Sequence, residues 1–268
     1  MGESNPISLA DVQAVYSGPE CNLWELIMGQ QIHIGGLQSS MDLAEKAGIA
    51  AGTSGIDFCC CTGAGMRFLV RFRGVAKMTG VDATSRVVEW GKKRSEEEGL
   101  ADSMSFVVAD VCESGLPDAS ADFVWGEDAW CYVVDKPRMI AEAARLVRPG
   151  GTIAFTDWVE GTSGLSDEER ERFLRFMKFP NVETIDGYQK LLTDNGCEIV
   201  YAEDTGRFGP YVDLYLNMIG MQLTYDALKI IGFDQAMLGA IGDEMQFMQG
   251  LAHAGKIAQG LFVARRPG

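Results

Sequence analysis

Three aspartates stand at the ends of short apolar stretches, where a parallel sheet would gather them. Asp57 lies within GIDFCC, Asp82 ends MTGVD and Asp110 ends MSFVVAD. Ligands of doubly wound sheets bind at the carboxyl ends of the strands, where a carboxylate can accept hydrogen bonds from ribose hydroxyls or from an adenine amine. Gly63 and Gly65 would let the backbone approach such a ligand closely. Together these residues predict an adenosine-type ligand.

Each of these aspartates alone could equally be a helix cap or a turn residue, so the prediction depends on their order and separation. The glycine spacing argues against two common nucleotide loops. The dinucleotide pattern G-x-G-x-x-G would need glycine at Cys61 and Met66 in one frame, or at Phe68 in the other. No G-x-x-x-x-G-K-[ST] loop is present. An NAD site and a P-loop therefore fit poorly.

Seven cysteines raise the question of a metal or redox site. Cys59, Cys60 and Cys61 are consecutive, no C-x-x-C pair occurs, and the chain has only two histidines. Zinc sites usually need paired ligands two to four residues apart, and neighbouring residues on an extended strand point to opposite faces. We therefore expect no metal, and we expect reduced thiols that pack as small apolar residues.

Charge and hydropathy limit the partners. The formal net charge is −15, and such a field repels nucleic acid and anionic membranes. No apolar run reaches the length of about 18 residues that a membrane helix needs, and the N-terminus lacks a signal pattern. We expect a cytoplasmic protein that acts on a small molecule, without a nucleic-acid or membrane partner, and we consider a homodimer.

Short apolar strands that alternate with helices must position these residues. This alternation is typical of a doubly wound α/β fold. We predict a Rossmann-like, seven-stranded, mainly parallel sheet with helices before it and a helical insertion at about 205–255, before the last strand. The expected strands are 54–60, 76–83, 104–110, 121–128, 152–158, 197–204 and 257–266, and the expected helices are 66–72, 85–100, 136–147, 166–177, 185–196, 210–231 and 233–255.

Four stretches resemble the successive motifs of class I S-adenosylmethionine-dependent methyltransferases. They read IDFCCCTGAG, TGVDATSRVVEWGKKR, FVVADV and EAARLVRPGGTIAFTDW, over about residues 50–160. The resemblance implies S-adenosylmethionine as cofactor, with Asp57 under its methionine amino group, Asp82 at the ribose and Asp110 at the adenine. The family's first motif is usually D-x-G-x-G-x-G. Cys59 and Cys61 stand where glycine is common, so we expect a slightly wider turn with less room near the cofactor.

A second likeness is more specific. WGEDAWCYVVDK resembles the W-x-x-D-A-x-x-x-x-x-D-K stretch of sarcosine/dimethylglycine methyltransferases and their phosphoethanolamine, tocopherol and sterol relatives, and LIMGQQIHIGG is similar to a segment that they place over the cofactor. It implies an N-terminal helical lid at 1–48, followed by the methyltransferase domain at 49–268. Many relatives carry histidine where this chain has Tyr132. Either Tyr132 replaces that histidine, or the mechanism needs no base.

The resemblance also implies roles for individual residues. As alternatives, His33 could be a structural histidine, and Trp130 and Tyr132 could be ordinary core residues at a strand end. The Met-rich helices are expected to be core or lid, with one face over the substrate. The expected catalytic residues are Tyr16, His33 and Tyr132; the expected cofactor residues are Gln31, Asp57, Cys59, Cys61, Gly63, Asp82, Ala83, Thr84, Asp110, Val111 and Glu127; the expected substrate-lining residues are Asp128, Trp130, Asp157 and Trp158.

Three functions remain open from the sequence. The first is methyl transfer to an amine nitrogen of a small molecule, which the dimethylglycine-like stretch favours. The second is transfer to carbon or oxygen of an apolar or phenolic acceptor, which the Met-rich helices favour. The third is a non-catalytic protein that binds S-adenosylmethionine as a partner subunit. Aromatic side chains and the acidic field would suit a cationic or amine-bearing molecule through cation–π contact.

Overall fold

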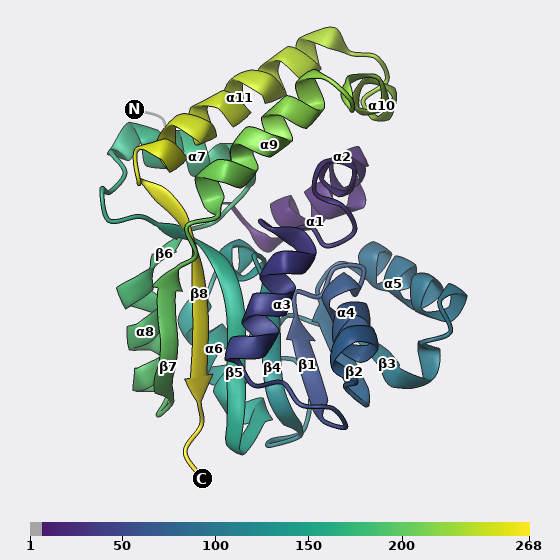
Figure 1. Cartoon of the computed structure of the whole chain (residues 1–268), viewed down its shortest axis with the longest axis vertical. Coiled ribbons are helices and arrows are strands. Elements are labelled where there is room, and N and C mark those ends of the chain that lie inside the picture. The colour runs from purple at the N-terminus through teal and green to yellow at the C-terminus, as the bar shows by residue number, and fades with distance from the viewer. Residues whose placement is uncertain (1–6) are drawn as a thin grey trace.

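A mostly parallel sheet forms the centre of the molecule in the computed structural model, which describes residues 7–268 (Figure 1). The strand order is β3-β2-β1-β4-β5-β8-β7, and a two-residue strand, β6, pairs with β5. β8 runs antiparallel to both of its neighbours. The strands are β1 Ser54–Phe58, β2 Lys77–Asp82, β3 Met104–Val108, β4 Ala121–Glu127, β5 Val147–Glu160, β6 Glu183–Thr184, β7 Glu198–Asp204 and β8 Ile257–Arg265.

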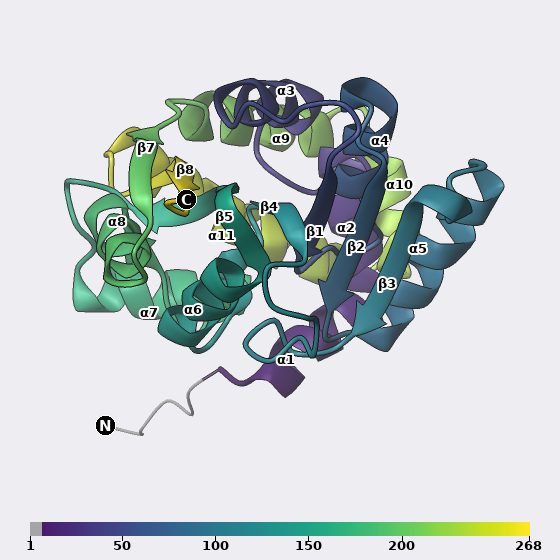
Figure 2. The ribbon, with the colours of Figure 1, turned by 90° about the horizontal axis from the view of Figure 1, so that it is seen from below.

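Helices cover both faces of this sheet, as its apolar central strands require. Figure 2 shows α3 and α4 on one side and α6 and α8 on the other, and α5 packs against β2 and β3. The short helix η1 (Ala101–Ser103) leads into β3. The predicted doubly wound α/β fold is confirmed. The covering helices are α3 Gly36–Lys46, α4 Ala64–Arg73, α5 Ser85–Glu97, α6 Lys136–Leu146 and α8 Ile185–Asp194.

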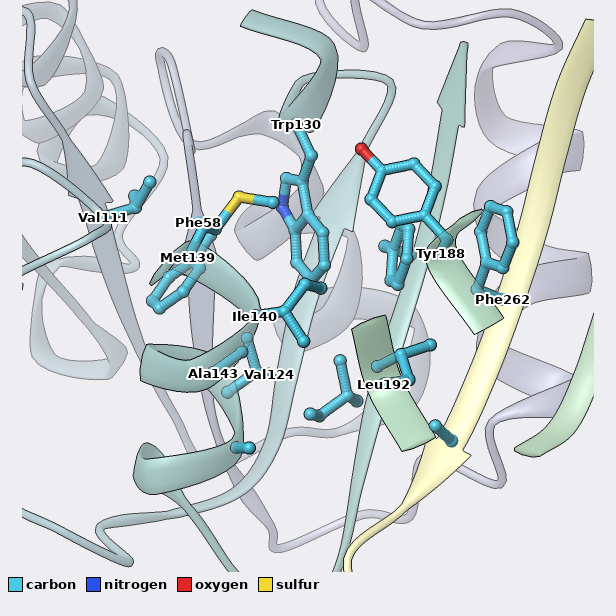
Figure 3. Close-up of a cluster of buried hydrophobic side chains, with 14 of the residues drawn as sticks. Phe58, Val111, Val124, Trp130, Met139, Ile140, Ala143, Tyr188, Leu192 and Phe262 are labelled. Atoms are coloured by element: carbon cyan, nitrogen blue, oxygen red, sulfur yellow. The ribbon is translucent and has the colours of Figure 1, made fainter. Parts of the chain in front are cut away.

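The largest hydrophobic cluster lies between the sheet and the helices α6 and α8. Figure 3 shows Trp130 and Tyr188 among aliphatic side chains of this layer. Trp130 stacks on Phe155 with ring centroids 3.9 Å apart, and Phe155 stacks on Phe262 at 4.6 Å. Close packing of these rings fixes β5, β8 and the segment that follows β4 relative to one another.

A second layer of helices lies beyond the carboxyl ends of the parallel strands (Figure 1). Three of these helices connect β7 to β8, two precede the sheet and one follows β5. All but the first helix share a separate hydrophobic cluster that includes Ile27, Trp158, Val212 and Met248. These helices are α1 Leu9–Ser17, α2 Pro19–Met28, α7 Asp167–Met177, α9 Phe208–Gly220, α10 Thr224–Ile230 and α11 Gln235–His253.

Local signals explain several boundaries. α7 begins with a capping box, because Ser166 accepts a hydrogen bond from the Glu169 backbone and Glu169 accepts one from the Ser166 backbone. Two ranges differ from expectation. β5 begins at Val147, upstream of the Pro149–Gly151 stretch, and the helix expected over 210–231 is interrupted near Met221. No helix in residues 7–268 is both long and apolar enough to cross a membrane.

Candidate active site

A cavity of about 200 Å³ opens at the carboxyl ends of β1, β2 and β4. We call it the cofactor cavity. It brings together residues that the sequence predicted from four separate motifs. Of the predicted site residues, its lining includes Tyr16, Gln31, His33, Asp57, Cys59, Cys61, Asp82, Ala83, Thr84, Asp110, Val111, Glu127, Asp128 and Tyr132.

The turn after β1 forms the floor of this cavity. Cys59 and Cys61 have φ angles of 57° and 47°, and Gly63 has 76°, so alternate residues occupy the left-handed region. A side chain there costs about 1–2 kcal/mol relative to glycine. Gly65 must stay small, because a Cβ there would lie 2.6 Å from Glu127 Oε2. The two cysteines thus adopt the left-handed backbone that glycine favours.

Asp82 closes one side of the turn. Its carboxylate accepts hydrogen bonds from the backbone N–H groups of Cys61 (2.9 Å) and Thr84 (2.8 Å). Desolvation raises the pKa of Asp82, while these two donors oppose the rise. The carboxylate therefore joins β2 to the turn and still has lone pairs for a ligand in the cavity.

Asp57 lies deeper and has no hydrogen-bond donor among the described residues. It is 4% exposed. Burial first, and then the charges of Glu127 and Asp82, raise its pKa well above the usual value. A carboxylate in this position lacks a cationic partner, and an ammonium group in the cavity would supply one.

Glu127, His33 and Gln31 meet at Ser40, a residue that the sequence analysis missed. Ser40 Oγ donates to Glu127 Oε1 at 2.6 Å, accepts from Gln31 Nε2 at 2.9 Å and lies 3.2 Å from His33 Nε2. His33 Nε2 is also 3.3 Å from Glu127 Oε1, and its Nδ1 lies 3.4 Å from the Ile34 carbonyl. His33 is thus placed to orient Glu127 at the cavity wall.

A second, smaller cavity adjoins the first under the lid helices. We call it the apolar chamber. Tyr16, Ile32, Asp128 and Tyr132 line both cavities. Among the lining residues of the described chain none is Lys, Arg or His. The chamber is lined by Tyr16, Trp24, Met28, Ile32, Ile34, Asp128, Tyr132, Trp158, Met177, Phe179, Val212, Tyr215, Met245 and Met248.

Tyr16 and Tyr132 stand at the junction of the two cavities. Their rings meet edge to face, with centroids 5.3 Å apart, and Tyr132 packs on Phe179 at 4.8 Å. Burial is the largest cause that raises the pKa of both phenols. Both hydroxyls are therefore neutral near pH 7 and can donate or accept a hydrogen bond.

Two predicted substrate-lining residues lie elsewhere. Trp130 lines neither cavity, because it is fully buried against Phe155 in the core. Asp157 is also fully buried and accepts hydrogen bonds from the Cys131 backbone (3.0 Å) and from Tyr188 Oη (2.5 Å). Burial raises the pKa of Asp157 to about 7. Successive strand residues face opposite sides, so Trp158 reaches the chamber and Asp157 does not.

These positions give Asp157 a supporting role. It holds the short helix η2 (Trp130–Tyr132), which carries Tyr132. Gly63 likewise stands behind the cavity wall, since a Cβ there would lie 2.8 Å from the Phe106 ring. No cluster of three or more potential metal ligands occurs within residues 7–268.

Known proteins resemble this chain in sequence and fold. Residues 56–155 match the family described as a methyltransferase domain. Methyltransferase GfsG of Streptomyces halstedii is 28% identical over 218 residues, which cover 77% of this chain and 78% of GfsG. The chain spans about half the length of other curated relatives, among them the 27-O-demethylrifamycin SV methyltransferase of Amycolatopsis mediterranei (34% identity over 134 residues, 49% of each protein).

Solved structures share the fold. A Galdieria sulphuraria protein assigned as a sarcosine dimethylglycine methyltransferase has a TM-score of 0.81 and 19% identity, over 93% of this chain and 98% of that one. Phosphoethanolamine N-methyltransferase 2 of Haemonchus contortus has a TM-score of 0.84 and 20% identity, over 97% of this chain and 59% of that one. These likenesses establish the fold alone.

The residues of the cofactor cavity fit S-adenosylmethionine. Asp57 offers an unpartnered carboxylate to an ammonium group, Asp82 offers free lone pairs to ribose hydroxyls, and Gly65 permits close backbone approach. Asp110 lines the far side of the same cavity. With the methyltransferase domain matched over residues 56–155, this fit identifies an enzyme that carries a class I methyltransferase domain and uses S-adenosylmethionine.

Proposed function

We propose that this enzyme methylates an uncharged, apolar small molecule at oxygen or carbon. The observation that carries the proposal is the lining of the apolar chamber, which is aromatic, aliphatic or Met at nearly every position. Its one carboxylate, Asp128, already accepts hydrogen bonds from Ile34 and Gln259. An acceptor that enters the chamber would therefore meet mainly apolar surface.

The absence of basic side chains among the described residues that line the chamber also supports an uncharged acceptor. A phosphomonoester acceptor would need Lys or Arg partners once it was removed from water. None of the chamber-lining residues described is basic. Relatives named for apolar acceptors include a tocopherol O-methyltransferase and a sterol 24-C-methyltransferase, whereas another relative is a phosphoethanolamine N-methyltransferase. The chamber favours the first kind of acceptor for this chain.

The residues of the chain would act mainly by holding the reactants. Bound S-adenosylmethionine supplies an electrophilic methyl group, and in-line transfer depends on the position of the nucleophile. Asp57 and Asp82 would bind the cofactor, and the Tyr16 and Tyr132 hydroxyls would orient an acceptor oxygen at the junction. The free space in the chamber is about 30 Å³, so α2, α9 and α11 must move apart to admit the acceptor and then exclude water.

Methylation of an amine nitrogen is the second candidate. Aromatic faces support it, because Trp158, Tyr132 and Phe179 line one side of the chamber, and such faces attract a cationic product. A neutral amine needs no base in the protein, which would explain tyrosine at position 132. A small zwitterionic amine such as dimethylglycine would nevertheless leave its carboxylate unpaired in the chamber. We also propose that the enzyme works without nucleic-acid or membrane partners, given its net charge of −15.

A screen with methyl-labelled S-adenosylmethionine tests the acceptor class. The panel would contain phenols, prenyl alcohols and macrolide alcohols on one side, and dimethylglycine, sarcosine and phosphoethanolamine on the other. We expect label in one or more of the apolar acceptors. Label only in the amines would overturn the proposal. Tight cofactor binding without turnover of any acceptor would count against both candidates.

A further inference from the structure

Gln259 is a buried polar residue in an otherwise apolar strand. It lies on β8, opposite Trp158 of β5, and is fully buried. Its side-chain amide donates to Asp128 Oδ1 (3.0 Å) and Oδ2 (2.9 Å) and to the Ile34 carbonyl (3.0 Å). Its own carbonyl accepts from Thr205 Oγ1 at 2.9 Å. Both N–H groups of the amide and one lone pair of its carbonyl are therefore used inside the protein.

Asp128 accepts hydrogen bonds from both Gln259 and the backbone of Ile34. Its carboxylate Oδ2 accepts the backbone N–H of Ile34 at 2.7 Å, so Ile34 is held through both its N–H and its C=O. The backbone of Asp128 has a φ of 51°, and its N–H donates to the Thr156 carbonyl at 2.8 Å. Asp128 lines both the cofactor cavity and the apolar chamber.

The three residues connect segments that lie far apart in the sequence. Gln31, Ile32 and His33 immediately precede Ile34 and line the cofactor cavity. Of the two side chains that contact the Ile34 carbonyl, Gln259 is the closer, at 3.0 Å, while His33 Nδ1 lies 3.4 Å away. A buried carboxylate requires donors. Burial raises the pKa of Asp128, while Gln259 and Ile34 oppose that rise.

We propose that Gln259 is a positioning residue of this methyltransferase, which ties Asp128 to Ile34 and thereby holds the 31–34 loop against the cofactor cavity. Gln259 reaches the cofactor only through these two residues. The proposal rests on the cofactor site and does not depend on the identity of the acceptor. Loss of the bridge would release the loop and expose the site to water, which would weaken cofactor binding.

Calorimetric titration with S-adenosylhomocysteine tests this role without any acceptor. Gln259→Leu keeps much of the volume but removes the amide, and we expect its affinity per folded molecule to fall by about tenfold or more, which corresponds to about 1.4 kcal/mol. Gln235→Leu, at an exposed position at the start of α11, is the matched control and should bind like the wild type. An affinity within twofold of wild type, with only a lower melting temperature, would reduce Gln259 to a structural residue and overturn the proposal.

Gln259→Glu provides a second test if the leucine variant does not fold. It places two carboxylates together, and such a pair shares a proton. A protonated Glu side chain has one O–H, so it could donate to Asp128 but not also to the Ile34 carbonyl. We expect S-adenosylhomocysteine affinity to be only partly reduced at pH 5.5, where this half of the bridge is restored, and at least tenfold weaker than that of the wild type at pH 8.

Asp128 also interacts electrostatically with His33, Cys131, Asp157 and Tyr215. The quantity compared is therefore the ratio of variant to wild-type affinity at each pH, in which their own titration largely cancels. A ratio that stays constant from pH 5.5 to pH 8 would contradict a bridge through Gln259.

Discussion

The cofactor cavity and the apolar chamber share Tyr16, Ile32, Asp128 and Tyr132 but are built in different ways. The floor of the cofactor cavity comes from successive strand ends, so Asp57, Asp82 and their neighbours appear in the sequence in a fixed order. The chamber takes its walls from α2, β5, α7, α9 and α11, which are far apart in the chain. Recognition of the cofactor therefore depends on the strand ends of the sheet, whereas recognition of the acceptor depends on how the lid helices pack.

Removal of the Asp82 carboxylate should disable the cofactor cavity and spare the chamber. Each hydrogen bond to a charged group contributes about 1.5–3 kcal/mol, so the loss of two ribose contacts in Asp82→Ala should weaken S-adenosylhomocysteine binding by at least roughly 100-fold. Calorimetry measures the affinity. Asp102→Ala, at an exposed position before β3, is the control. Unchanged binding by the Asp82 variant would remove the basis for the cofactor assignment.

Asp157 offers a test of the support behind the chamber wall. Its folded-state pKa is raised to about 7, so the folded protein holds a proton that the unfolded chain has lost. The stabilising contribution is complete below about pH 4 and disappears as the pH rises through 7. Relative to Asp157→Asn, the wild type should lose about 2–3 kcal/mol of unfolding free energy between pH 5 and pH 8, since about two pKa units lie between pH 5 and the folded-state pKa and each is worth about 1.4 kcal/mol.

Urea unfolding at several pH values measures this difference. Asp226→Asn, the control, changes an exposed carboxylate on α10. Its unfolding free energy should change with pH in the same way as that of the wild type. If the unfolding free energies of Asp157→Asn and the wild type also changed with pH in the same way, the Asp157 carboxyl group would be ionised throughout. The buried position assigned to it would then be wrong.

The junction tyrosines connect the two cavities, and their hydroxyls should affect turnover more than cofactor binding. Tyr132→Phe removes the hydroxyl while keeping the ring that packs on Phe179. We expect kcat to fall by about tenfold, as for the loss of one orienting hydrogen bond of about 1.4 kcal/mol. S-adenosylhomocysteine affinity should stay within twofold. A kcat equal to that of wild type would favour an amine acceptor, which needs no oriented hydroxyl.

The smallest effect is expected at the turn after β1. Cys59→Gly relieves a left-handed side chain but adds freedom to the unfolded chain, so its net change in unfolding free energy should stay within about 1 kcal/mol. Cys59→Val should destabilise by about 2 kcal/mol, because a β-branched residue is poorly tolerated at positive φ. Thermal unfolding measures both variants. Equal stability of the two would show that the backbone at position 59 is not left-handed in solution.

Local patterns predict the cofactor side well. The doubly wound sheet and the strand-end positions of Asp57 and Asp82 follow from apolar runs and turns that are contiguous in sequence. The sequence motif also indicates that Cys59 and Cys61 replace glycine, and both residues have the positive φ angles that glycine favours. Asp157 and Trp158 were both expected to line the substrate site, although neighbours on a strand face opposite sides.

The chamber could not be predicted in this way. Phe179, Val212 and Met245 approach one another only after the helices pack, and no spacing in the sequence encodes that contact. Ser40 and Gln259 carry no motif either. A Gln within an apolar strand near the C-terminus, IAQGLFVAR, is the one signal that could have marked Gln259 as a buried hydrogen-bonding residue.

The difference between the two cavities is tested most directly by the ratio of two kcat/KM values measured in one assay of S-adenosylhomocysteine release. One value is for a neutral phenolic or prenyl acceptor found in the methyl-transfer screen, and the other is for dimethylglycine. A chamber without a basic residue should favour the neutral acceptor by roughly 100-fold or more, because the unpaired carboxylate of dimethylglycine costs about 3 kcal/mol or more on burial. A ratio that favours dimethylglycine would contradict the assignment of the chamber as an apolar acceptor site.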